Sequence, residues 1–254
     1  ALLGPEAGFV SMIAVLLVQC LLFADGGIMA LGANIWNMAF YGCFVGGYLI
    51  WRQFMKKGMS RNKIIAASIL GSVLTLQLGA FSVTIETLAS GVTELPFSVF
   101  LATMQPIHLA IGLGEGLITS AVLVFIHETK PELLWCCNKE EKEGFTLKKL
   151  VAVLAAIAAI IGGVVSLFAS AFPDGLEWSM EKVAGTTELA RDGGMYSFAE
   201  KIQSVTALLP DYSIEGANEM VGTSFSGILG GIIVVIVCVG VCYALKMFRK
   251  SINE

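Results

Sequence analysis

Long apolar stretches separated by short polar segments dominate the chain. Six of them approach or exceed the length of a membrane-crossing helix, and they cover residues 9–23, 28–50, 64–85, 97–126, 150–172 and 225–248. A helix needs about 20 predominantly apolar residues to cross about 30 Å of hydrocarbon. The pattern therefore predicts an all-α polytopic membrane protein, built as a bundle of membrane-crossing helices.

Two prolines modify the prediction for the fourth stretch. Pro96 and Pro106 stand close to its start, and a proline removes a backbone hydrogen bond and kinks or breaks a helix. We therefore expect this stretch to begin in a loop or a re-entrant segment.

The apolar stretches fall into two blocks. Residues 1–130 hold four of them, joined by short loops, and are predicted to form one bundle. Residues 131–147 form a charged cytosolic linker, which is the expected boundary. Residues 148–254 hold the last two stretches around the outer segment 173–222, which predicts a two-helix hairpin module. Glycines four apart, such as those at 112 and 116 and at 227 and 231, predict close helix packing.

Composition supports the membrane interpretation. Of 254 residues, 56% are hydrophobic and 14% are charged, whereas soluble domains carry roughly 25% charged residues. A soluble fold would have to bury almost the whole chain, so lipid is the simpler environment.

The charges predict an orientation in the cell membrane. Five basic residues and no acid lie between positions 52 and 63, and the C-terminal tail adds Lys246, Arg249 and Lys250. By the positive-inside rule these segments, and hence the C-terminus, are cytoplasmic. The acidic segment 173–222 then lies outside. An acidic outer face suits a cation substrate. However, acidic outer loops also result from the positive-inside rule alone, because basic residues concentrate on the cytoplasmic side.

Five polar residues in or beside the apolar stretches are the candidates for chemistry, because each costs a few kcal/mol in hydrocarbon unless it is paired or faces a wet cavity. They are Asp25, Asn34, Asn37, His108 and Glu115. Asn34 and Asn37 are three residues apart, on one face of a helix. His108 and Glu115 are seven apart, about 10 Å along a helix axis.

Two interpretations compete for the face that carries His108 and Glu115. One is an ion pathway or metal site, since imidazole and carboxylate both ligate transition metals. The other is a hydrogen-bonded polar seam between helices. The separation of the two side chains favours the seam, because they cannot bind one ion together without other ligands.

The motifs of soluble enzymes are absent from the sequence. It contains two histidines, no His-Glu-x-x-His helix, no phosphate-binding glycine loop followed by lysine, and no Gly-x-Ser-x-Gly turn. We therefore expect a transport subunit rather than an enzyme, with any ATP hydrolysis carried out by partner subunits. We expect no bound cofactor and no nucleic-acid partner.

Four runs of sequence, in order, carry a family resemblance. They read LLGP at 2–5, LVQCLLFADGG at 17–27, LGANIWNM at 31–38 and PIHLAIGLGEGLIT at 106–119. Together they resemble the CbiM/NikM family, the substrate-capture components of cobalt and nickel energy-coupling-factor transporters. The run PDGLE at 173–177 resembles the signature of the PDGLE module, a small accessory component of the CbiN/NikN type.

The resemblance implies a function and a set of partners. A capture component binds Co(II) or Ni(II) near its outer face, and a coupling membrane subunit (the T component) and two ATPase subunits drive its release inward. The PDGLE module assists metal loading. The expected function is therefore divalent cobalt or nickel capture for an ATP-driven importer.

The resemblance also implies where the metal ligands should be. In the family they are the N-terminal amine, a histidine after the initiator Met, and a histidine in a Gly-Thr-Ser loop, all of which would precede Ala1. We therefore expect this sequence to lack the first part of the family bundle. The five candidate residues, from Asp25 to Glu115, match family positions that support the site or line a pathway.

Two other functions remain open at this stage. A chain without the ligand histidines could be a non-catalytic accessory or scaffold subunit that has lost metal binding. Alternatively, the face with His108 and Glu115 could serve a stand-alone ion channel or carrier.

Overall fold

The computed structural model describes residues 1–92, 94–136, 146–168, 172–187, 193–214, 216 and 218–252. Most of the predicted linker, residues 137–145, lies outside the described residues. So do residues 188–192 of the predicted outer segment and the side chains of Arg249 and Lys250.

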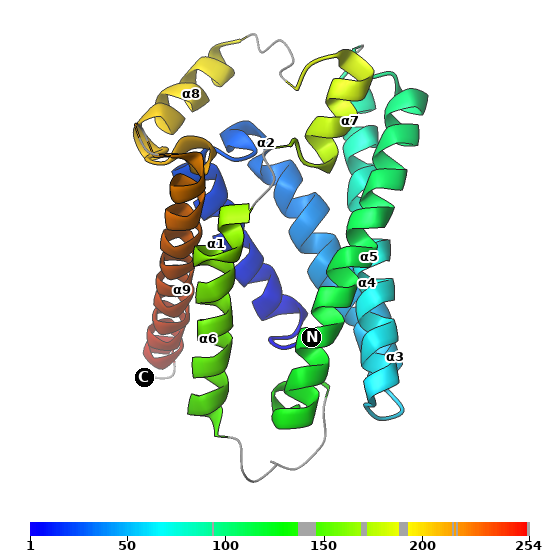
Figure 1. The fold of residues 1–254 in the computed structure, drawn as a ribbon, viewed down its shortest axis with the longest axis vertical. Helices are drawn as coiled ribbons and strands as arrows, with labels where there is room; N and C mark the ends of the chain where they lie inside the picture. The colour runs from blue at the N-terminus through cyan, green and yellow to red at the C-terminus, as the bar shows by residue number, and fades with distance from the viewer. Residues whose placement is uncertain are drawn as a thin grey trace. The chain divides into compact units, whose positions relative to one another are not determined.

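The described residues form helices and no strand (Figure 1). The helices are α1 (Pro5–Phe23), α2 (Gly27–Asn34), η1 (Ile35–Trp51), α3 (Arg52–Met55), α4 (Arg61–Ala89), α5 (Phe97–Thr129), η2 (Pro131–Leu133), α6 (Leu147–Gly163), η3 (Val165–Phe168), α7 (Gly175–Ala184), α8 (Gly194–Thr206), η4 (Pro210–Tyr212) and α9 (Glu219–Ile252). Six helical stretches are long and apolar enough to cross a membrane. The all-α polytopic prediction is confirmed.

The helices form two compact units. The first consists of Ala1–Phe9, Gly32–Val151 and Ala171–Asp192, and the second of Val10–Leu31, Ala152–Ser170 and Gly193–Glu254. Each unit therefore takes segments from both blocks of the sequence. The linear division at residues 130 and 148 stays a prediction.

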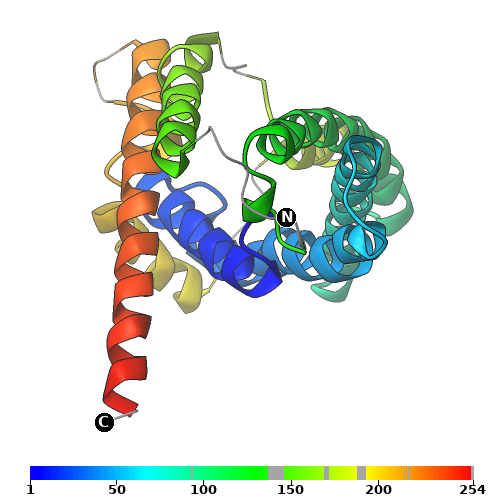
Figure 2. The same cartoon turned by 90° about the horizontal axis from the view of Figure 1, so that it is seen from below.

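Close packing of α4 against α5 organises the first unit, where the two helices run side by side (Figures 1 and 2). A Cβ atom added to Gly112 would lie 2.9 Å from the Cα of Val73, and one on Gly116 would lie 2.6 Å from the Cα of Ile69. No side chain fits at such distances, so the predicted role of this glycine pair is confirmed.

Helix α5 differs from its prediction at its start. It is continuous from Phe97 to Thr129 with Pro106 inside it, so the expected loop or re-entrant start is wrong. Next to the proline, the side-chain amides of Gln77 and Gln105 each donate to the other residue's backbone carbonyl, at 2.8 and 3.2 Å. These two hydrogen bonds join α4 to α5 beside the proline, and packing against neighbouring helices is one way in which a membrane helix tolerates proline.

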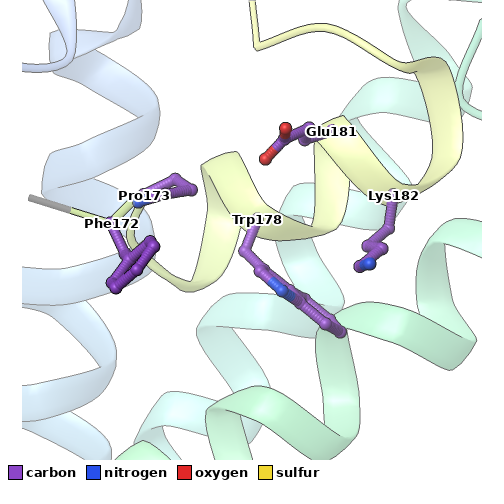
Figure 3. Close-up of a pocket in the computed structure, with 5 residues that line it drawn as sticks. All are labelled: Phe172, Pro173, Trp178, Glu181 and Lys182. Atoms are coloured by element: carbon purple, nitrogen blue, oxygen red, sulfur yellow. The ribbon is translucent and has the colours of Figure 1, made fainter.

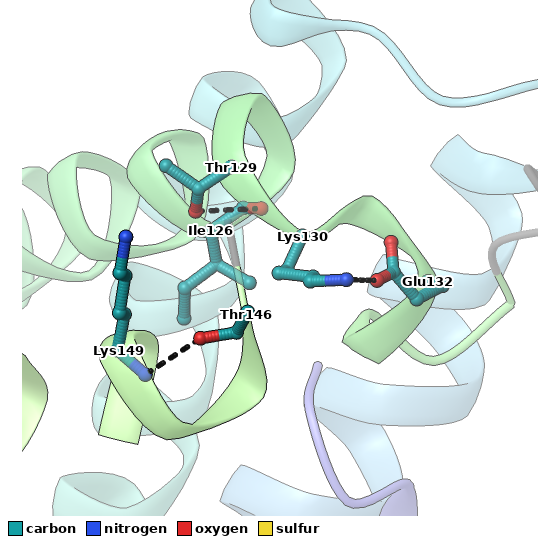
Figure 4. A network of polar contacts seen from close by, with 6 residues as sticks. All are labelled: Ile126, Thr129, Lys130, Glu132, Thr146 and Lys149. Carbon is teal, nitrogen blue, oxygen red and sulfur yellow. Dashed lines mark hydrogen bonds and ion pairs between the residues drawn. The ribbon is translucent and has the colours of Figure 1, made fainter. Parts of the chain in front are cut away.

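The first unit continues from the end of α5 to the start of α6 (Figure 4). Lys130 and Glu132 form an ion pair of 2.9 Å, in which the lysine side chain is only 5% exposed. On the other side of the gap in the described chain, the Thr146 hydroxyl accepts a hydrogen bond of 3.4 Å from the backbone N–H of Lys149. These contacts stabilise both ends of the predicted linker.

The second unit contains the pair α6 and α9. A Cβ atom on Gly227 would lie 3.0 Å from the carbonyl oxygen of Gly162, and Ser224 donates a hydrogen bond of 2.6 Å to the carbonyl of Gly163. The predicted close packing is confirmed at Gly227. Around Gly231 no described atom lies within 4 Å of an added Cβ.

Candidate functional site

Asp25 lies in the turn that follows α1, as predicted. Ala24 adopts a left-handed conformation with φ of 60°, and Gly26 and Gly27 have φ of 71° and 70°. Glycine adopts such angles at no steric cost, so the sequence allows the chain to reverse here. The carboxylate of Asp25 is exposed.

The Asp25 carboxylate is held by two side chains of the second unit. Its Oδ2 accepts hydrogen bonds from the Tyr212 hydroxyl at 2.5 Å and from the Gln19 amide at 3.2 Å. The Tyr212 ring stacks on Phe23 with 4.6 Å between centroids. Burial raises the pKa of the Tyr212 phenol, and its hydrogen bond to Asp25 raises the pKa further. The phenol therefore remains a proton donor at neutral pH.

Gln203 fixes the backbone of the same turn. Its side-chain amide donates to the carbonyl of Ala24 at 3.1 Å, and its amide oxygen accepts from the N–H of Ile28 at 3.4 Å. We call Gln19, Asp25, Gln203 and Tyr212 the Asp25 cluster. It joins a turn of the first sequence block to residues of the second.

Backbone strain accompanies the Asp25 cluster. Asp211 and Tyr212 have φ of 51° and 58°, and a left-handed conformation costs roughly 1–2 kcal/mol for a residue other than glycine. Ser226 donates a hydrogen bond of 3.0 Å to the carbonyl of Tyr212. Strain of this kind persists only where the surrounding contacts hold it in place.

Asn34 and Asn37 lie in two consecutive helical segments. Asn34 ends α2 and makes no capping hydrogen bond, whereas Asn37 lies in η1, a π-helix whose wider turns change the spacing of faces. Asn37 is 7% exposed, and its amide donates to Glu86 of α4 at 2.9 Å. One turn further along, the hydroxyls of Tyr41 and Ser82 lie 2.8 Å apart. The result is a polar seam between η1 and α4.

The amide oxygen of Asn37 is the unusual atom of this seam. It is buried, and no described residue donates a hydrogen bond to it. A buried acceptor without a partner costs about 1–3 kcal/mol.

His108 of α5 faces α7. Its Nδ1 lies 2.8 Å from the carbonyl oxygen of Met104, one turn earlier in α5. Its opposite edge meets α7, since a Cβ atom on Gly175 would lie 3.1 Å from Cε1 and 3.4 Å from Nε2. His108 therefore contacts the PDGLE run.

Glu115 lies on an exposed part of α5 and interacts electrostatically with His108. No group of three or more His, Cys, Asp and Glu side chains suited to an ion occurs among the described residues. Asp25 belongs to the second unit, and the other four belong to the first.

Five contributing residues were missed by sequence reasoning: Gln19, Glu86, Gly175, Gln203 and Tyr212. Tyr212 is 187 positions from its partner Asp25, and Glu86 is 49 from Asn37. The PDGLE run was noticed as a signature, but only the structure shows what its glycine contacts.

Comparisons with known proteins match two parts of the chain to two family models. Residues 1–133 match the family described as "cobalt uptake substrate-specific transmembrane region", CbiM, and residues 148–247 match the PDGLE domain. No solved structure matches the chain.

Curated relatives match one or both blocks. An Archaeoglobus fulgidus protein, provisionally named fused nickel transport protein NikMN, is 35% identical over 92% of this chain and 70% of its own length. The cobalt transport protein CbiM of Kyrpidia tusciae is 36% identical over 56% of this chain and 58% of its own length. The chain thus spans only part of each relative. It belongs to the CbiM family, and carries a PDGLE domain in the same polypeptide.

Proposed function

We propose that the chain is the membrane subunit of an importer that captures Co(II) or Ni(II) at the outer face of the cell membrane. The observation that carries this proposal is the match of both blocks, in order, to a relative named as a fused nickel transport protein. The transported ion is the substrate, and no resident cofactor is needed.

ATP-driven coupling by partner subunits completes the proposal. The sequence carries no phosphate-binding loop, so we assign ATP hydrolysis to two ATPase subunits and its mechanical coupling to a T component. The exposed position of Glu115 on α5 supports the proposal that a membrane partner contacts this helix. A carboxyl group on the exposed face of a membrane-crossing helix is costly unless a partner or water covers it.

The proposed orientation has the C-terminus in the cytoplasm. Exposed Arg52, Lys56, Lys57 and Arg61 flank the turn between α3 and α4, which supports a cytoplasmic location for this turn. The Asp25 turn, one membrane crossing earlier, then lies outside.

Among the proposed supporting residues, Asn37 and Glu86 are the ones that we propose to line the path of the ion. The amide oxygen of Asn37 lacks a donor, and the Glu86 carboxylate lies against the same side chain. A water molecule or a passing cation would relieve the cost of that buried oxygen. Asn34 and Asp25 are proposed to shape the surrounding backbone rather than to ligate the ion.

Calorimetric titration with Ni(II) and Co(II) tests the capture step. The full-length natural protein should bind one of these ions tightly, with Mg(II) as the control ion. Residues 1–254, titrated in parallel, show whether these residues hold the ion by themselves. Equal binding by both would move the site to residues such as Asn37 and Glu86. No binding by the full-length protein would contradict capture and favour a scaffold subunit.

A further inference from the structure

We propose that the run Pro173–Glu177 is a docking motif, and that the face of α5 around His108 is its receptor. The partner that fits this face is a short helix with no side chain on its first residue, followed by apolar residues. In this chain the partner is α7. The proposal concerns how the PDGLE domain attaches to the CbiM region and holds whether or not a metal is transported.

The aspartate of the motif starts the helix. Asp174 is the N-cap of α7, and its side chain accepts a hydrogen bond of 2.8 Å from the N–H of Glu177. N-cap residues of this type satisfy one of the free N–H groups of the first turn. Gly185 ends the helix in a left-handed conformation, with φ of 73°. The segment therefore carries start and stop signals for a helix of its own.

The glycine of the motif allows contact with α5. Gly175 is buried, and an added Cβ atom would lie 2.8 Å from the Cδ1 of Ile111 and 3.1 Å from the Cε1 of His108. The end of the Ile111 side chain can move aside. His108 is restrained because its Nδ1 is hydrogen-bonded to the carbonyl of Met104. A side chain at position 175 would therefore push α7 away from α5.

The leucine of the motif begins the apolar face of α7. Leu176, Met180 and Val183 pack against a buried cluster of Ala80, Leu95, Phe100 and Met104. Their spacing of four and three residues places them on one side of the helix. Ser179, on the same buried side, is 0% exposed and donates a hydrogen bond of 2.7 Å to the carbonyl of Gly175.

On the other side of α7, Trp178, Glu181 and Lys182 are exposed. Phe172, Pro173, Trp178, Glu181 and Lys182 line an open depression, shown in Figure 3. Lys182 lies over the Trp178 ring, 5.7 Å from its centroid, and Phe172 is 86% exposed. Only one side of α7 is used for docking, which is how a peripheral helix attaches to a preformed receptor surface.

Accessibility of a cysteine at position 179 measures docking in the full chain. In the Ser179→Cys protein, reaction with a maleimide is followed by peptide mapping. Native Cys20, which is 2% exposed, serves as the internal reference for intact folding. The cysteine at 179 should be protected while α7 is docked.

Gly175→Val should raise the labelling rate at position 179 about tenfold or more, a factor that corresponds to about 1.4 kcal/mol of lost docking energy. The reference Cys20 should stay protected. The matched control is Gly194→Val, since Gly194 is likewise the first residue of a helix but an added Cβ would meet no atom within 4 Å. That control should leave both rates unchanged.

Unchanged labelling at position 179 in Gly175→Val would overturn the proposal, as would an equal increase in Gly194→Val. If Gly175→Val also exposes Cys20, the milder Gly175→Ala decides. It should raise labelling at 179 alone, and by less than Gly175→Val, because the added side chain is smaller. No increase in Gly175→Ala would contradict the steric explanation.

Discussion

The residues of the PDGLE domain contact the CbiM region in two ways that differ in chemistry. The contact of α7 with α5 is apolar and depends on a missing side chain at Gly175, which is buried against Ile111 and His108. The Asp25 cluster is polar, partly exposed and built on strained backbone at Asp211 and Tyr212. The specificity of the first contact comes from the complementary shapes of α5 and α7. The specificity of the second comes from its hydrogen bonds.

This difference indicates how each contact can change. A side chain introduced at a glycine in an apolar contact disrupts the whole contact, because closely packed interfaces deform little. A solvent-accessible hydrogen-bonded cluster exchanges its partners for water, so the loss of each bond costs little. The α5–α7 contact should therefore be the durable attachment, and the Asp25 cluster the adjustable one.

The largest effect is expected from Leu176→Asp, which places a carboxylate against the cluster that contains Phe100 and Met104. Burial of an unpaired charge should destabilise docking by about 2–4 kcal/mol. Labelling of the cysteine at position 179 measures the effect. Leu176→Met conserves volume and should cost less than about 1.5 kcal/mol. Similar labelling of both variants would show that α7 is not attached through this face.

A smaller effect is expected from Tyr212→Phe, which keeps the stacking on Phe23 and removes the hydrogen bond to Asp25. Hydrogen bonds to charged groups contribute about 1.5–3 kcal/mol, and the exposure of Asp25 should reduce the loss to about 1 kcal/mol. Thermal unfolding in detergent should show a decrease of about 2–4 °C. A double-mutant cycle with Asp25→Asn should give a coupling energy near this value. Strict additivity would argue against a direct Asp25–Tyr212 interaction.

A further effect of about 1 kcal/mol is expected from Asp174→Ala, because it removes the N-cap of α7. The loss should affect docking of α7 and leave protection of Cys20 unchanged. Asp174→Asn retains a capping oxygen and should behave as the natural protein does. Equal loss in both variants would indicate a role for the negative charge rather than for the cap.

The smallest effect is expected from raising the pH. Burial raises the pKa of Tyr212 in the folded protein, so the stability associated with its protonated form is present below the pKa of an unfolded tyrosine, about 10. That stability is lost as the pH rises beyond this value. Unfolding temperatures should therefore fall more above pH 10 in the natural protein than in Tyr212→Phe. Parallel decreases in the two proteins would show that the half-buried position of the phenol contributes no stability.

Much of the fold could be predicted from the sequence, because membrane crossing is a local property of about 20 residues. The six stretches and the close approach at Gly112 and Gly116 were both readable in this way. Pro106 misled the prediction for α5, since the sequence alone does not reveal that a neighbouring helix supplies Gln77 beside it.

The candidate site was less predictable, because it depends on contacts between distant positions. Asp25 and His108 were recognised as polar residues in unusual places, but their partners Tyr212 and Gly175 could not be deduced from spacing. The partner of Asn37 was equally hidden, since Glu86 stands on another helix. Glycine is the hardest partner to predict, because it contributes through the absence of a side chain.

Uptake of radioactive nickel and cobalt into proteoliposomes tests the proposed function most directly. The full-length natural protein would be reconstituted with the coupling subunit and the two ATPase subunits, with ATP supplied on the side that the ATPases face. We predict metal accumulation that requires ATP and every subunit. We also predict that the Gly175→Val substitution reduces this accumulation and that the Gly194→Val substitution does not. Accumulation by this chain alone, driven by a pH or voltage gradient and indifferent to ATP, would contradict an ATP-driven capture subunit and identify a stand-alone carrier.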